Sequence, residues 1–191
     1  MPLARLYHVF NVQQCDLPAR LQPFLQIEPK SPDPQPQIAA CEQILTHMPN
    51  RPAITHHEAR AYYTPVHDTV NMPTCGLFPQ IEHYYSVLFH ELTHSTGHWQ
   101  RLNRQTLTDL CPFGSTNYSK EELVAEMGAA FLCGVAGIAN ETVDNSAAYI
   151  QSWLTKLQND TRLVILAAAQ AQKAVDYVLG KVTTQEEIRL D

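Results

Sequence analysis

Long apolar runs and an excess of basic residues are both missing from this sequence of 191 residues. No run approaches the roughly 18 apolar residues of a membrane span, so we expect no membrane partner. The 13 Lys and Arg residues against 19 Asp and Glu give a net charge of -6, which excludes a generally basic nucleic-acid-binding surface as the main function. Charged residues make up only 17% and hydrophobic residues 45%, a composition that excludes a wholly disordered chain.

Paired cysteine motifs are also missing. The five cysteines are scattered along the chain, odd in number and never arranged as CxxC. This pattern indicates neither a disulfide framework nor a zinc ribbon. The N-terminus has no signal-peptide core either. We therefore expect a reducing cytoplasm as the location.

The N-terminal half predicts short strands and loops around one small helix. We expect a single domain over residues 1–191, although the abrupt start in a predicted strand suggests a piece of a longer protein. The predicted segments are a strand at 3–12, a proline-rich loop at 28–36, a short helix from Ile38 to Leu45, and two strands within 59–72 around a turn at Pro65–Asp68. Pro65 predicts an edge position, and a polar tail is expected at 180–191.

The C-terminal half predicts helices. The first, from Pro79 to about Thr96, carries an apolar stripe at i, i+3, i+4 spacing and ends at Gly97. Three more are predicted, from Ser119 to about Val135, from Asp144 or Asn145 to about Leu157, and from Asn159 or Asp160 to about Leu179. Strands followed by helices predict an α+β fold.

The first of these helices contains the motif His90-Glu91-Leu92-Thr93-His94, an HExxH pattern. Residues i and i+4 share one helix face, so His90 and His94 can each give a ring nitrogen to one metal ion. Glu91 is rotated by about 100° from His90 and can flank the metal as a general base. The pattern therefore predicts a catalytic metal site.

A catalytic zinc also needs a third protein ligand. Glu122 and Glu126 share a face of the next predicted helix, and we expect Glu122 as the ligand and Glu126 as the residue that orients a histidine. Two alternatives stay open. Glu126 can be the ligand, and Glu122 can instead cap the helix by bonding back to Ser119.

Two further residues are candidates. His98 follows His94 by four residues, but a continuous helix would place it about 12 Å along the axis from His90, so only a break at Gly97 could bring it to the ion. Tyr118, just before the second helix, is a candidate hydrogen-bond donor to a tetrahedral intermediate.

The segments that hold these residues resemble a known family. Tyr84–Arg104, Glu121–Cys133 and Ala147–Leu179 are similar to the zincin-like metallopeptidase domain of ArdC-type antirestriction proteins, whose relatives occur in plasmid DNA primases and phage polyvalent proteins. The opening YHVFNVQQC and the stretch AYYTPVHDTVNMP fit the same domain. Ser95 departs from the Trp of many relatives, at what we expect to be the substrate-side rim of the helix.

The resemblance implies a zincin-like fold with a small, mostly antiparallel N-terminal sheet packed on the HExxH helix. It implies a metal held by His90, His94 and a glutamate, with Glu91 as the base. It also implies a bacterial plasmid or phage setting, in which the protein enters a recipient cell during conjugation and protects incoming DNA from restriction. Single-stranded DNA binding belongs, in typical members, to an N-terminal domain that we do not expect within these residues, so we expect no single-stranded DNA partner for this chain itself.

Two functions follow from these observations. The first is a metallopeptidase, gluzincin-like, with Zn²⁺ (Mn²⁺ is the alternative ion) and a protein or peptide substrate. The second is a non-proteolytic, metal-stabilised binding module that contacts restriction or replication proteins. A fourth coordination position left open favours the first function, and a fourth protein ligand favours the second.

Overall fold

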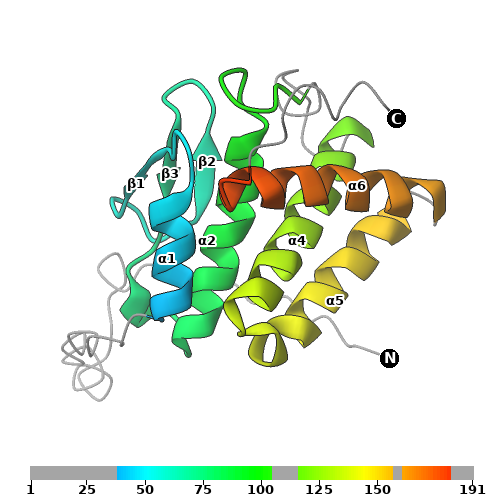
Figure 1. Ribbon diagram of the computed structural model, residues 1–191. Coiled ribbons are helices and arrows are strands. Elements are labelled where there is room, and N and C mark those ends of the chain that lie inside the picture. Colours follow the sequence, from blue (N-terminus) through cyan, green and yellow to red (C-terminus); the bar gives the residue numbers. More distant parts are fainter. Residues whose placement is uncertain (1–37, 105–115, 157–160, 182–191) are drawn as a thin grey trace, which may run out of the picture. The chain divides into compact units, whose positions relative to one another are not determined.

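The computed structural model describes residues 38–104, 116–156 and 161–181 (Figure 1). All of them lie within a compact unit that begins at Pro34. The predicted strand at 3–12, the proline-rich loop at 28–36 and most of the polar tail at 180–191 lie outside the described residues. The single domain over residues 1–191 therefore stays a prediction.

A small sheet of three strands packs against the helix that carries the HExxH motif. The strands are β1 (Ala53–Thr55), β2 (Tyr62–Thr64) and β3 (Thr69–Asn71), in the order β1-β3-β2. β3 pairs antiparallel with β2, with Tyr63 opposite Val70, and parallel with β1. The two strands around Pro65 were predicted, and β2 is an edge strand as expected. β1 was not predicted, because it has only three residues and follows Pro49 and Pro52.

The helices confirm an α+β fold. Within the described ranges they are α1 (Ala39–His47), α2 (Ile81–Thr96), α4 (Thr116–Ala136), α5 (Ala139–Lys156) and α6 (Thr161–Val178), with a 3-10 turn at Cys75–Leu77. None of these helices combines the length and the apolarity that crossing a bilayer requires.

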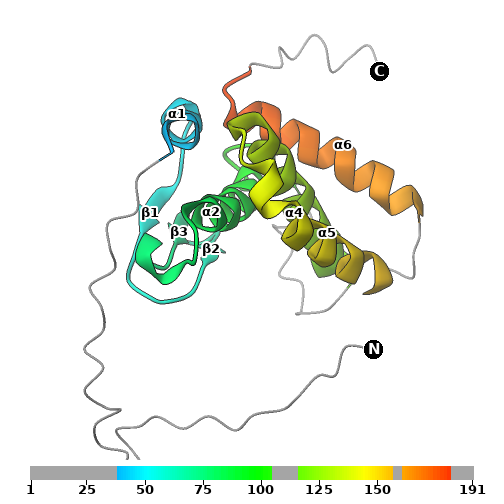
Figure 2. The ribbon, with the colours of Figure 1, turned by 90° about the horizontal axis from the view of Figure 1, so that it is seen from below.

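The helix α2 lies between the sheet and α4, and α4 in turn packs against α5 and α6 (Figures 1 and 2). The predicted apolar stripe is buried as expected, with Tyr85, Leu88 and Leu92 almost inaccessible to solvent. These residues belong to a core shared by α1, the sheet, α2 and the second half of α4. A second core, around Leu123 and Trp153, joins the first half of α4 to α5 and α6.

The second half of α2 is buried on every side, because all residues from Glu91 to Thr96 are buried. The hydroxyl groups of its small polar side chains donate hydrogen bonds to backbone carbonyls of the same helix. Thr93 donates to the carbonyl of Phe89, Ser95 to that of Leu92 and Thr96 to that of Thr93, each at 2.7 Å. Buried hydroxyl groups are tolerated when they are bonded in this way. Ser95 is therefore an interior residue, and the expectation that it lies at a rim is wrong.

Two predicted helix starts are also wrong. The helix α4 begins at Thr116, so Ser119 lies inside the helix. The helix α5 begins at Ala139, five residues before Asp144. The residues between 139 and 144 read as polar and lack apolar periodicity, which hid the first turn. Gly97 does end α2, but with a right-handed φ of -73°.

Arg101 fixes the β2–β3 turn to the end of α2. Its guanidinium donates to both carboxylate oxygens of Asp68 at 2.9 and 2.7 Å, to the carbonyl of Ser95 at 3.1 Å and to that of Asn50 at 2.7 Å. Tyr63 donates to the same Asp68 carboxylate at 2.8 Å. Asp68 and Asn50 have positive φ values of 49° and 45°, a backbone region that Asp and Asn tolerate best among non-glycine residues.

Candidate metal centre

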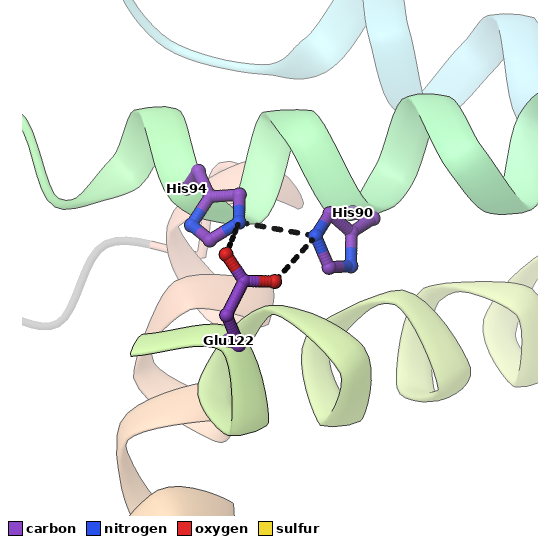
Figure 3. Close-up of side chains that lie close together, drawn as sticks. All are labelled: His90, His94 and Glu122. Atoms are coloured by element: carbon purple, nitrogen blue, oxygen red, sulfur yellow. Dashed lines mark hydrogen bonds and ion pairs between the residues drawn. The ribbon is translucent and has the colours of Figure 1, made fainter. Parts of the chain in front are cut away.

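The side chains of His90, His94 and Glu122 meet between α2 and α4 (Figure 3). One ligand atom from each lies within 4.8 Å of the others. The two Nε2 atoms of the histidines are 3.0 Å apart. The Glu122 carboxylate faces both rings, with one oxygen 3.5 Å from Nε2 of His90 and the other 3.7 Å from Nε2 of His94. In the described part of the chain, this is the group of three whose spacing could hold a metal ion.

These distances fit a tetrahedral cation. Ligand atoms at 2.0–2.1 Å from a tetrahedral ion lie about 3.3 Å from one another. The two Nε2 atoms are 3.0 Å apart, and each lies 3.5 or 3.7 Å from its nearer oxygen of the same Glu122 carboxylate, which is close to that value. A cation would thus need only small side-chain adjustments.

The outer nitrogen of each histidine faces a carboxylate of α4. Nδ1 of His90 lies 3.5 Å from Glu126, and Nδ1 of His94 lies 3.3 Å from Glu121. A carboxylate at Nδ1 favours the tautomer with its proton there, which leaves the Nε2 lone pair free for a metal. Glu126 thus lies where a residue that orients His90 is expected. It contacts Nδ1 of His90, whereas Glu122 faces Nε2 of the same ring.

Glu121 is held in place by Arg104, just beyond α2. Arg104 donates to the two carboxylate oxygens of Glu121 at 2.5 and 3.1 Å, and also to the Thr93 carbonyl at 2.8 Å and the Thr96 hydroxyl at 2.5 Å. Both members of the ion pair are buried, with exposed fractions of 7% for Arg104 and 4% for Glu121. Burial alone would raise the pKa of Glu121, but His94 and Arg104 lower it to about 2.

Sequence reasoning missed both Glu121 and Arg104. The available signal was weak: Glu121 directly precedes Glu122, and a doublet of acids on a helix also fits an ordinary solvated face. Arg104 follows His94 by ten residues in the sequence, and neither this spacing nor its charge indicates a role in the metal site. Only the packing of α4 on α2 brings the two residues together.

The electrostatics of the site favour a positive charge. Burial opposes protonation of His90, yet Glu122 and Glu126 outweigh it and raise the pKa of His90 to about 10. Burial likewise opposes ionisation of Glu122, but both histidines lower its pKa. In the metal-free site His90 therefore carries an extra proton, and a bound metal cation would replace that proton.

The remaining predicted residues, Glu91, Tyr118 and His98, are not in the group of three. Glu91 is buried, and its charge acts on both His90 and Tyr118. Tyr118 lies beside Glu122, and burial together with that carboxylate raises its pKa. His98 is outside the group of three, and its Nδ1 accepts the Gln100 amide at 3.3 Å.

The predicted cap at Glu122 does not form. Ser119 lies inside α4 rather than before its first residue, and the Glu122 carboxylate faces the two histidines. A cap that bonds back to Ser119 needs Ser119 at the start of the helix. The carboxylate is thereby available to the candidate metal centre.

Gly128 lets α4 pack closely against α2 at Thr93. A Cβ atom on this glycine would lie 2.5 Å from Cγ2 and 2.7 Å from Oγ1 of Thr93, the residue before His94. Nothing in the local sequence pattern indicates this role for the glycine. Its missing side chain lets α4 come close enough for Glu121 and Glu122 to reach the histidines.

Comparison with known proteins identifies the family of this chain. Residues 39–170 match the model of a family described as zincin-like metallopeptidase. The chain is 39% identical over 174 residues to the DNA primase TraC of Escherichia coli, covering 90% of this chain but 11% of TraC. It is 34% identical over 176 residues to the uncharacterized protein y4eC of Sinorhizobium fredii, covering 92% of this chain and 53% of y4eC.

Two crystal structures of the antirestriction protein ArdC from plasmid R388 are also similar. The Mn(II)-bound structure has a TM-score of 0.58 and 37% identity, over 75% of this chain and 53% of ArdC. The metal-free structure has a TM-score of 0.57 and 35% identity, over 75% of this chain and 50% of ArdC. The chain thus spans about half the length of ArdC and of y4eC, and a small part of TraC. Because the family model matches most of its length, the chain belongs to the zincin-like metallopeptidase family.

Proposed function

We propose that this domain is a divalent-metal-dependent peptidase. The observation that carries the proposal is that two Nε2 atoms and one carboxylate, the three candidate ligands among the described residues, come together between α2 and α4. Three ligands leave one position open for water or substrate, which is the arrangement of catalytic rather than structural zinc sites. His98, which could close that position, is outside the group.

His90, His94 and Glu122 would hold the cation, with Zn²⁺ as the proposed ion. Two imidazoles and one carboxylate suit Zn²⁺, and they do not exclude Mn²⁺. The Mn(II)-bound form of ArdC supports a divalent ion of this kind. Glu126 and Glu121 would orient the two rings through Nδ1.

The proposed reaction is the addition of water to a peptide bond. The bound cation would polarise the scissile carbonyl and lower the pKa of the attacking water. Glu91 would take a proton from this water as its oxygen bonds to the carbonyl carbon. When the C–N bond breaks, Glu91 would give that proton to the leaving amine. Tyr118, which lies beside Glu122, would donate a hydrogen bond to the carbonyl oxygen.

The proposed biological setting is that of an antirestriction-type protein of plasmids or phages, with a protein or peptide as the substrate. The similarity to ArdC of plasmid R388 and to the DNA primase TraC supports this setting. Binding of single-stranded DNA is not proposed for this domain, because its net charge is -6.

The test compares metal content and cleavage in the same preparations. We expect the wild type to hold about one equivalent of metal and to cleave a peptide library analysed by mass spectrometry. Glu91→Gln should keep the metal and lose cleavage by at least about a hundredfold. Glu82→Gln, in the first turn of the same helix, is the matched control and should change neither.

Two results would contradict the proposal. Cleavage by Glu91→Gln at the wild-type rate would exclude Glu91 as the base. A wild type that binds metal without cleaving any peptide, while still protecting DNA from restriction in cells, would favour the metal-stabilised binding module instead.

A further inference from the structure

A cavity of about 430 Å³ opens beside the candidate metal centre, among α2, α4 and α5. His90, Glu122 and Glu126 line one end of it. Because His90 and Glu122 are two of the proposed ligands, a group bound at the metal could extend directly into this space. Its size is at the lower end of the range for ligand pockets, which suits one large side chain and its adjoining backbone.

Two aromatic rings form fixed walls of the cavity. Phe78 stands edge-on to Tyr84, with ring centroids 5.5 Å apart, and Trp153 stands edge-on to Tyr118 at 5.9 Å. Trp153 is buried and belongs to the second core. Rings held in this geometry by a neighbour present a rigid apolar surface. Tyr118 lies beside Glu122, so one wall is linked to a proposed metal ligand.

The mouth of the cavity carries an aromatic ring that is open to solvent. Tyr149, on α5, lines the cavity and is 58% exposed. A bound apolar side chain would cover part of this ring and remove its surface from water. Asn145, also on α5 and exposed, lies at the same mouth.

The charged groups of the cavity lie at its metal end. Among the residues that the structure describes, its lining contains no lysine or arginine, and its carboxylates are those of Glu122 and Glu126, beside His90. His83, another lining residue, has its Nε2 3.2 Å from the carbonyl of Glu141, so this nitrogen is already engaged. Away from the metal end, an acidic side chain would thus lose its hydration among aromatic rings without a lysine or arginine to pair with.

We propose that this cavity is the specificity pocket of the domain, which takes an aromatic or large aliphatic side chain from the substrate residue next to the scissile bond. The inference rests on the proposed peptidase function. It adds the substrate class, because it names the apolar walls, and the lack of a lysine or arginine beside them, as the features that select the side chain.

The first experiment measures the affinity of the metal-loaded protein for two peptide hydroxamates that differ in one side chain, benzyl or methyl. We expect the benzyl compound to bind at least about tenfold more tightly, since several methylene equivalents are buried. Val87→Trp places an indole on a lining position and should abolish this difference. Asn145→Trp, at an exposed lining position, is the second variant in case the first does not fold. Val143→Trp, at an exposed position of α5 outside the lining, is the matched control and should keep the preference.

The second experiment needs neither metal nor cleavage. The metal-free protein is titrated with N-acetylphenylalanine amide and, separately, with N-acetylaspartate amide, while amide signals are followed by NMR. We expect shifts confined to cavity-lining residues with the first compound and none with the second. Loss of metal binding or of cleavage would overturn the peptidase function, and this titration would still decide the pocket.

Three outcomes would overturn the pocket itself. The first is equal affinity of the wild type for the two hydroxamates. The second is a preference for the benzyl compound that remains unchanged in both folded tryptophan variants. The third is a set of NMR shifts at the cavity that are as large for the aspartate compound as for the phenylalanine compound.

Discussion

Arg104 and Glu121 form a buried, two-pronged ion pair directly behind His94. The carboxylate of Glu121 accepts from Nη2 and Nε of Arg104 on one side, and it lies 3.3 Å from Nδ1 of His94 on the other. The Arg104 guanidinium also bonds to the turn of α2 that precedes His94. The orientation of a proposed metal ligand therefore depends on a residue ten positions beyond it in the sequence.

Loss of the Glu121 charge should weaken metal binding. Glu121→Gln keeps the volume but removes the acceptor charge from His94, and carboxylates of this kind are worth about 10- to 100-fold in metal affinity. A competition titration with a fluorescent chelator measures the change. Glu141→Gln, an exposed glutamate on α5, should leave affinity unchanged. An unaltered affinity in Glu121→Gln would show that the carboxylate does not orient the ring.

Loss of Arg104 should destabilise the fold rather than only the site. Arg104→Met leaves Glu121 buried without its cation, which costs about 3–5 kcal/mol. Denaturant unfolding with and without metal measures the free energy. The double variant Arg104→Met/Glu121→Met removes both charges and should recover part of the loss. If the single variant unfolds at the wild-type denaturant midpoint, the ion pair does not contribute to stability.

The same ion pair predicts acid sensitivity. The pKa of Glu121 is lowered to about 2 in the folded protein, so its stabilising contribution is complete above the ordinary glutamate pKa of 4.5. It should fall as the pH drops from about 4.5 towards 2. Glu121→Gln should unfold with a weaker pH dependence in this window than the wild type. Identical slopes in the two proteins would contradict the assignment.

Metal binding should depend on pH through His90. In the metal-free protein this ring has a pKa of about 10, so it is protonated at neutral pH. The protonated ring stabilises the metal-free fold fully below its ordinary pKa of 6.5, and this contribution is lost as the pH rises towards 10. A metal must displace the proton, so affinity should increase with pH across this range and one proton should be released per ion. Calorimetry in buffers of different ionisation enthalpy counts the protons, and a count of zero at pH 7 would contradict this account.

Gly128 should tolerate no side chain. In Gly128→Ala the new methyl group would collide with Thr93, which costs about 1–3 kcal/mol of folding free energy and moves α4 away from the histidines. Gly134→Ala is the matched control on the same helix, because nothing lies within 4 Å of that position. The control should be neutral or stabilising by up to about 1 kcal/mol. Thermal unfolding and metal content, measured together, test both expectations.

The sequence could predict what depends on local spacing. The HExxH pattern and the stripe through Leu88 and Leu92 identified α2 and its inward face, because helical periodicity fixes both. The acids at Glu122 and Glu126 were found for the same reason. The first turn of α5 was missed, since Ala139 and the polar residues after it have no apolar period.

What the sequence could not predict depends on contacts between distant segments. Arg104 meets Glu121 only because α4 folds back on α2, and Gly128 matters only because Thr93 stands opposite it. Burial of Ser95 likewise follows from packing on every side of α2. Short strands such as β1 depend on their partners more than on their own residues.

The most direct test of the central claim is a crystal structure of the metal-loaded protein with anomalous scattering measured at the metal edge. The account predicts one peak within about 2.0–2.2 Å of Nε2 of His90, Nε2 of His94 and a carboxylate oxygen of Glu122, with water in the remaining position. A peak elsewhere, or a fourth protein side chain bound to the ion, would contradict it.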